Sequence, residues 1–409
     1  MRTYFWFALL LVTALPARGE TINTLSQAYA LAWMRQPVMQ AAAERENALR
    51  SRRSAANALT PEPPSVELGG RTDRWNNQRG ATEQEIGLVL PLWLPGERSG
   101  SQALADAEIS ALDGRLAALR LQLAGELRDA WWGWQFASNE RALAAQRVAA
   151  AGRLRDDVVR RANAGDLSRA DRHQAEGALA SALAQQAEAE SAGVAAQSRL
   201  HGLLGQLPTE RGVVAEPLDN LPPATQLADA PADEHPALRA LQARGDVSRR
   251  SLELARARTR NSPEIAVGTR RERGVSGDAM EQTWALALRI PFSSGARNDA
   301  RVSEANADLI ESTLQYDRER ERLNHERSAS ESRLLSARSL LAAAELRARL
   351  AIENRGFFEK SFRLGETDLP TRLRIELEAF EAERQASRAQ INLAQSISAY
   401  RQVLGLLPE

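Results

Sequence analysis

The chain has 409 residues, and 53 Lys and Arg residues balance 53 Asp and Glu residues, so the formal net charge is zero. This balance argues against a nucleic-acid-binding surface. Cysteine is absent, which excludes disulfides, thiolate metal sites, cysteine nucleophiles and a lipid attached through an N-terminal cysteine.

Residues 1–19 have the pattern of a secretory signal peptide. Arg2 is followed by the apolar run Phe5–Ala14 and by a small-residue cleavage site that ends at Gly19. The apolar run is shorter than the ~20 residues that a spanning helix needs, and no later stretch approaches that length. We therefore predict an exported, non-lipidated chain without a transmembrane helix in its mature part.

The mature chain contains two repeats that are offset by about 200 residues, since Pro91 corresponds to Pro291 and Gly165 to Gly365. A unit of this length is too large for a solenoid repeat, so each repeat is one structural half. The predicted organisation is repeat 1 over residues 20–205, a Pro-rich linker over 206–235 and repeat 2 over 236–409.

In each repeat, short helices precede a strand hairpin. Helices are predicted over 24–36, 38–59 and 237–260, and the two hairpins over 64–92 and 263–291, where the apolar period changes to two. The residues on the apolar face of the hairpins are Ile86, Leu88, Leu90, Trp284, Leu286, Leu288 and Ile290. Either these residues face lipid or they form the covered side of two half-buried soluble hairpins.

A long helical hairpin follows in each repeat, over residues 100–205 and 296–405. The proline-free outgoing helices would each be roughly 95–100 Å long. The returning helices are shorter by about 25 residues, which is close to the length of the short helices over 38–59 and 237–260. Stacking a short helix end to end on each returning helix would make up the missing length.

Four strands per chain are too few to close a barrel, because eight is the practical minimum. An open sheet in lipid would leave backbone groups unpaired at both edges, which the hydrocarbon layer does not tolerate. The strands are long enough to cross the layer when tilted. The sequence therefore favours an oligomer in which each chain contributes four strands to one shared barrel.

The chain resembles the TolC-type outer-membrane efflux proteins over its whole mature length. The resemblance lies in LSQAYALAWMRQPVMQAA, in EHPALRALQARGDVSRRSLELA, in the strand ends at Pro91 and Pro291, and in the tip turns ANAGDLSRADRHQAE and FRLGETDLPTRLRIELEAFEA. Within the family, the chain is most similar to the outer-membrane subunits of heavy-metal exporters of the resistance-nodulation-division type. The family's acidic gating positions correspond here to Thr371 and Arg374.

The resemblance implies a mostly helical fold with a small β part, and a homotrimer with a twelve-stranded outer-membrane barrel and a helical tunnel through the periplasm. It also implies two partners, a periplasmic adaptor protein and an inner-membrane exporter. The expected function is a passive exit duct of a tripartite efflux pump, with heavy-metal cations as the expected cargo. Organic toxicants or proteins secreted by a type I pathway remain alternative cargoes.

The turn between the two helices of each long hairpin is the expected docking site for the adaptor. A glycine at the end of a helix allows a positive φ, and both repeats have one. The residues assigned to these tips are Gly165, Asp166, Leu167, Gly365, Glu366, Asp368 and Leu369. The alternative is that the glycines belong to ordinary loops and that Asp368 and Ser168 only cap helices.

Other residue clusters give no catalytic, cofactor or metal assignment. The sequence has no phosphate-binding loop, nucleophile elbow or paired-His zinc motif, so we predict a non-enzyme without a cofactor. His173 and Glu176 share a helix face but are too few for a metal site. Trp131, Trp132 and Trp134 are absent from the second repeat and are expected to pack in the girdle region.

Two further classes of function remain open at this stage. A periplasmic adaptor also combines helical hairpins with strands, but it usually has one hairpin between β-rich halves. A secreted coiled-coil scaffold would have no reason to carry the alternating faces at Ile86–Leu90 and Trp284–Ile290.

Overall fold

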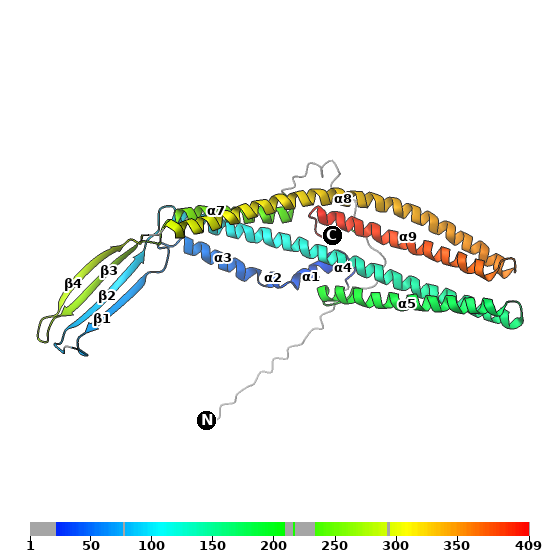
Figure 1. Cartoon of the computed structure of the whole chain (residues 1–409), viewed down its shortest axis with the longest axis horizontal. Helices are drawn as coiled ribbons and strands as arrows, with labels where there is room; N and C mark the ends of the chain where they lie inside the picture. The colour runs from blue at the N-terminus through cyan, green and yellow to red at the C-terminus, as the bar shows by residue number, and fades with distance from the viewer. Residues whose placement is uncertain (1–21, 77, 209–215, 217–233, 293–294, 409) are drawn as a thin grey trace, which may run out of the picture.

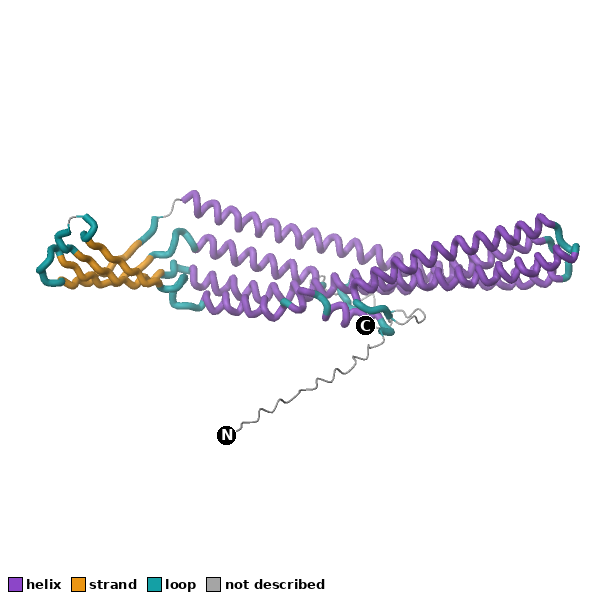
Figure 2. Tube along the Cα trace, turned by 90° about the horizontal axis from the view of Figure 1, so that it is seen from below, coloured by secondary structure: helices purple, strands orange, loops and turns teal. Residues whose placement is uncertain are grey.

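The computed structural model describes residues 22–76, 78–208, 216, 234–292 and 295–408. The molecule is elongated, with a β-sheet at one end and two helical tips at the other (Figures 1 and 2). The predicted signal peptide and nearly all of the predicted linker lie outside the described residues. In the described part of the chain, no helix combines the length and the apolar character that crossing a membrane requires.

The sheet has four antiparallel strands in the order β1-β2-β3-β4. Their bounds are β1 Ser65–Thr72, β2 Thr82–Pro91, β3 Glu264–Arg273 and β4 Glu281–Arg289. Both hairpins predicted from the change of period are therefore confirmed. The central pairing of β2 with β3 joins the two repeats.

Two very long helices run from the sheet to the tips. They are α4, Glu97–Ala164, and α8, Gly295–Arg363, with 68 and 69 residues, and each is about 100 Å long. The returning helices are α5, Arg169–Leu204, and α9, Leu369–Val403. The predicted fold, mostly helical with long hairpins and four strands, is confirmed.

Short helices continue the returning helices toward the sheet. They are α1 Leu25–Met34, α2 Pro37–Gln40, α3 Ala42–Ala56 and α7 Pro236–Ala257. The end of α5 at Gly205 lies against Arg35, and a Cβ added to Gly405 at the end of α9 would lie 2.7 Å from Pro236 Cδ. The expected end-to-end stacking is therefore present in both repeats (Figure 1).

The prediction of one helix over 38–59 is wrong in detail. The structure has two helices there, which are separated at Ala41, and the second ends at Ala56. Its early end has a physical cause. The Trp93 indole donates to the carbonyl oxygen of Ala58 over 3.2 Å, and Arg98 donates to that of Asn57 over 2.7 Å. These side chains satisfy the terminal carbonyls in place of a further helical turn.

The helices lie in the same order as the strands that they adjoin. β1 follows α3, β2 leads into α4, β3 follows α7 and β4 leads into α8. The contacts between α3 and α4, α4 and α7, and α7 and α8 reproduce this order. The chain therefore forms a curved wall that is one helix thick rather than a globule with a central core.

Three small clusters of buried side chains hold this wall together. The largest packs α1 against α4 and α5 at mid-length and includes Trp131, Trp132 and Trp134, each 2–3% exposed. This confirms the packing role that we predicted for the tryptophans. On α5, Ala175 and Ala182 are buried against α4. Their small side chains let the two helices approach closely.

Candidate functional site: the helical tips and the sheet

Both tip glycines have the expected left-handed conformation, with φ of +91° at Gly165 and +80° at Gly365. At the first tip, the backbone N–H groups of Gly165 and Asp166 donate to the carbonyl oxygens of Ala162 and Arg161. The second tip makes the equivalent pair of bonds from Gly365 and Glu366 to Phe362 and Ser361. This is the Schellman arrangement, which requires a residue that tolerates positive φ.

Capping side chains start the two returning helices. The Ser168 hydroxyl accepts from the Asp171 N–H at 3.1 Å, and the Asp171 carboxylate accepts from the Ser168 N–H at 2.9 Å. Asp368 accepts from the Thr371 N–H at 3.1 Å. Hydrogen bonds from the Thr371 side chain and backbone hold the pKa of Asp368 below its ordinary value. The capping roles expected for Ser168 and Asp368 are therefore confirmed.

A cation–π stack joins the two tips. The guanidinium groups of Arg161 and Arg372 both lie over the Phe362 ring, at 5.0 Å and 4.7 Å from its centroid. Arg161 also donates to the Phe362 carbonyl oxygen over 3.3 Å. Because Arg161 belongs to α4 and Phe362 to α8, this stack fixes one tip relative to the other.

One assigned tip residue does not lie on the surface. Leu369 is 1% exposed and packs with Leu154, Val158 and Phe362 beneath the tips, because the first turn of α9 faces α4 and α8. Leu167 is partly buried against the same cluster. The remaining assigned residues, Gly165, Asp166, Gly365, Glu366 and Asp368, are exposed.

Leu364 is an exposed apolar residue that sequence reasoning missed. It is 75% exposed and directly precedes Gly365 in the second tip. The corresponding position in the first repeat is Ala164, which is also exposed. The available signal was a leucine directly before the tip glycine, a position where the first repeat has alanine.

A partly buried carboxylate ties α9 to α4 above the tips. Glu140 accepts hydrogen bonds from Arg384 at 2.8 Å and from Arg388 at 2.7 Å. Burial alone would raise the pKa of Glu140, but the hydrogen bonds from Arg388 and Arg384 outweigh it and lower that pKa. At the two positions that the resemblance assigned to an acidic gate, the Thr371 N–H donates to the Asp368 carboxylate and Arg374 pairs with Glu378 at 2.7 Å.

The strand register places apolar side chains of all four strands on one face of the sheet. We call this face the apolar face. Ile86 lies opposite Leu68 and Thr269, and Thr269 lies opposite Trp284. Two further rows contain Val66, Leu88, Val267 and Leu286, and then Leu90, Ile265 and Leu288. Trp284 and Leu286 are 75% and 78% exposed, whereas Leu90 is half-buried.

The opposite face, which we call the charged face, carries every glutamate of the four strands. Arg270 on this face pairs with Glu83 at 2.9 Å and with Glu85 at 3.6 Å. Next to this group the register aligns Glu83 with Glu272 and Glu272 with Glu281. Carboxylates outnumber guanidinium groups on this face, which carries Glu67, Glu83, Glu85, Glu264, Glu272 and Glu281 against Arg71, Arg270 and Arg289.

A buried ion pair fastens one linker residue to the wall. Glu216 is 4% exposed and pairs with Arg128 of α4 at 2.8 Å. It also lies 3.5 Å from Arg401 of α9 and accepts a hydrogen bond from Ser398. Sequence reasoning missed this contact, because a single glutamate in a Pro-rich segment gives no periodic signal.

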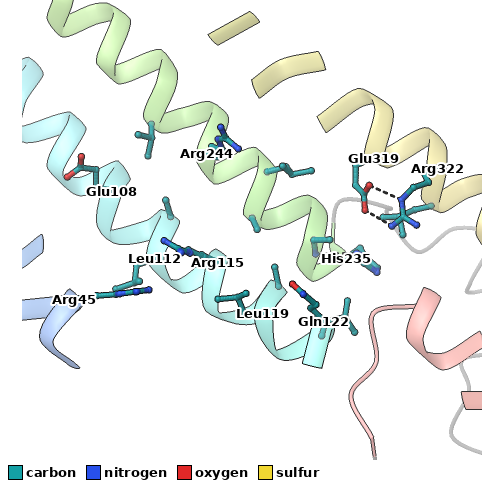
Figure 3. Close-up of a pocket in the computed structure, with 18 of the residues that line it drawn as sticks. Arg45, Glu108, Leu112, Arg115, Leu119, Gln122, His235, Arg244, Glu319 and Arg322 are labelled. Carbon is teal, nitrogen blue, oxygen red and sulfur yellow. Dashed lines mark hydrogen bonds and ion pairs between the residues drawn. The ribbon is translucent and has the colours of Figure 1, made fainter. Parts of the chain in front are cut away.

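An open hollow of about 1130 Å³ lies over α3, α4, α7 and α8. Figure 3 shows Arg45, Arg115 and Arg244 around it, together with Glu108 and the Glu319–Arg322 pair, whose closest atoms are 2.7 Å apart. Charges of both signs alternate with leucines in the lining. This mixture selects no single ligand charge, and we assign no site to the hollow.

Comparison with known proteins gives one family match and a set of solved structures with the same fold. Residues 28–206, which span most of the first repeat, match the family described as Outer membrane efflux protein. No curated protein matches the chain. The solved structures that share its fold cover both repeats.

Three of these structures illustrate the likeness. A membrane protein from Pseudomonas aeruginosa is 18% identical with a TM-score of 0.74, covering 94% of this chain and 91% of that one. CusC is 14% identical with a TM-score of 0.76, covering 94% and 92%. The CmeC outer membrane channel of Campylobacter jejuni is 13% identical with a TM-score of 0.76, covering 96% and 90%.

The fold is thus that of outer-membrane channels. Residues 28–206 are similar to the family of outer membrane efflux proteins, and the solved channels share the fold of both repeats.

Proposed function

We propose that three copies of this chain form the exit duct of a tripartite efflux pump. The observation that carries the proposal is a sheet with two unpaired edges and an exposed apolar face. β1 and β4 each have one neighbour in the described sheet. In lipid, such edges must be paired, and pairing β4 of one copy with β1 of the next closes a ring.

In this assembly the apolar face contacts lipid and the charged face lines the lumen. Ile86, Leu88, Leu90, Trp284, Leu286, Leu288 and Ile290 are then the lipid-facing residues, as the sequence predicted. The rows in the register support this assignment, because apolar side chains continue across all four strands without a carboxylate among them.

Metal cations are the cargo that we propose. The charged face supports this choice, since its excess of carboxylates would raise the local concentration of cations near the outer end of the duct. Passage would be passive, and the inner-membrane exporter would supply the energy. Organic toxicants and secreted proteins are the competing cargoes, because neither requires a particular charge in the barrel.

The two tips are the proposed contact with the periplasmic adaptor. Gly165, Asp166, Gly365, Glu366 and Asp368 would form the exposed part of that contact, and Leu364 supplies an apolar side chain beside them. Leu167 and Leu369 would act indirectly, by holding the tip turns on the cluster beneath them.

The test of assembly is the mass of the detergent-extracted protein by mass photometry. We expect a particle of three protomers that stays intact in mild detergent, because separating the copies would expose two strand edges on each. A monomer that is stable without detergent would refute the proposed barrel and would favour a secreted scaffold or an adaptor instead.

A further inference from the structure

Two arginines interrupt the apolar face at the end that carries the strand turns. Arg271 and Arg273 of β3 are the charged residues that the register places on this face of the described strands. Arg271 donates only to the neutral Gln282 amide oxygen, over 3.3 Å from both Nε and Nη2. Arg273 donates to the carbonyl oxygen of Gly80 over 3.3 Å.

Two arginines on the charged face, in contrast, form ion pairs. Arg270 pairs with Glu83 and Glu85, and Arg289 lies 3.5 Å from Glu264. Every strand glutamate lies on the charged face, and none of the ion pairs among the described residues includes Arg271 or Arg273. A guanidinium group has five N–H donors, so most donors of both residues are left for another partner.

The position of the two arginines along the strands, relative to Trp284, places them at one level of the proposed barrel. Trp284 is paired with Thr269, and the next residue of β3 on the same face is Arg271, about 7 Å further from the helices. The apolar rows lie on the helix side of Trp284. Tryptophan accumulates at the boundary between hydrocarbon and headgroups, so Arg271 and Arg273 lie at headgroup level. In the proposed duct the helices extend into the periplasm, so this boundary belongs to the outer leaflet.

We propose that Arg271 and Arg273 bind the phosphate groups of the outer-leaflet glycolipid. Phosphate oxygens accept the paired N–H donors of a guanidinium group, and the acyl chains of the same lipid would cover the apolar rows beside them. The inference rests on the proposed lipid-facing assignment of the apolar face. It adds a lipid class and two residues that recognise it.

The expected size of the effect follows from the electrostatics of anionic membranes. Each arginine near such a surface changes the affinity for an anionic lipid roughly fivefold. Two independent arginines would change that affinity about 25-fold. Replacing guanidinium by ammonium in Arg271→Lys keeps the charge and loses only the paired geometry, so its effect should be smaller than that of Arg271→Gln.

The experiment measures retained lipid by native mass spectrometry. The assembled protein is reconstituted in phosphatidylcholine with lipid A or, separately, with phosphatidylglycerol, and is then released into detergent. Wild type should retain lipid A in preference to phosphatidylglycerol, and the variant with both Arg271→Gln and Arg273→Gln should lose most of it. Arg71→Gln is the matched control, since it removes one charge at a similar height on the charged face.

Equal retention by wild type and the double variant would overturn the inference, as would an equal loss in Arg71→Gln or a preference for phosphatidylglycerol. The absence of native cysteine allows a single nitroxide label at Leu286→Cys to report membrane depth. A label in water would overturn both the lipid-facing assignment and this inference. A label in lipid without any arginine dependence would overturn only this inference.

Discussion

Leu286 and Ala287 are neighbours in β4 that lie on opposite faces of the sheet. Leu286 is aligned with Val267 on the apolar face, and Ala287 is aligned with Ala266 on the charged face. Substitutions at these two positions therefore test which face of the sheet contacts lipid. A register shift of one residue would exchange their environments.

We expect Leu286→Arg to destabilise the inserted protein by about 2–4 kcal/mol if the side chain lies near the bilayer midplane. Ala287→Arg should cost less, since its guanidinium group would enter the aqueous lumen. Urea-induced unfolding from lipid vesicles measures both. If Ala287→Arg proves the more damaging variant, the assignment of the two faces is reversed.

Glu140 gives a pH dependence at the same scale. Its pKa is lowered from 4.5 in the folded protein. The carboxylate therefore contributes stability that is fully present above about pH 4.5 and is lost as the pH falls through the lowered folded-state pKa.

The expected readout is hydrogen exchange in α4 and α9 around Glu140, Arg384 and Arg388. Exchange should accelerate in wild type as the pH falls below 4.5, after correction for the intrinsic rate. Glu140→Gln should remove most of this pH dependence and should cost about 1–3 kcal/mol at neutral pH. An unchanged pH profile in the variant would show that another group is responsible.

At the scale of elements, the turns between helices determine where the wall ends. The sequence was sufficient to locate both tips, because each combines a glycine with a capping residue three positions later. It was also sufficient to locate the strands, where the apolar period changes from helical to two. The stack of Arg161 and Arg372 on Phe362 could not be predicted, because an arginine on a helix face gives no sign of its partner.

Gly365→Val should cost about 1–2 kcal/mol locally, because valine resists the positive φ that the turn requires. The long helices should persist, so the amount of trimer in the outer membrane should stay near normal while export falls sharply. Gly356→Val is the matched control, since Gly356 lies within α8 and no heavy atom lies within 4 Å of an added Cβ.

Export is measured in a strain that lacks its own duct. If Gly365→Val exports as well as Gly356→Val and wild type, then the tip glycines are ordinary loop residues and the proposed adaptor contact is wrong. Trimer yield, measured in the same cells, separates a defect in docking from a defect in assembly.

At the scale of the whole molecule, length arithmetic predicted the architecture better than any motif did. The end-to-end stacking of α7 on α9 followed from helix lengths alone, and Gly405 does lie against Pro236. The anchoring of Glu216 between Arg128 and Arg401 did not follow, because it joins parts of the chain that are far apart in sequence. Local patterns determine elements, whereas contacts between distant segments require the fold.

The cargo prediction belongs to this scale, because it depends on the field inside the closed barrel. Combined Glu83→Gln, Glu272→Gln and Glu281→Gln should lower export of divalent metal ions by about tenfold at low salt and less at high salt. Export of neutral dyes should not change. Arg71→Gln, in the row next to Arg270, should leave metal export equal or higher. Equal losses for metals and dyes would favour a general duct.

The duplication has a genetic consequence. Both tips are encoded in one reading frame but differ in sequence, with Ala164-Gly165-Asp166 in one and Leu364-Gly365-Glu366 in the other. A ring of three copies would present six tips of two alternating kinds. A single codon change would therefore alter every second tip and leave the others unaltered, so the two halves of the gene can diverge toward two different contacts with one partner.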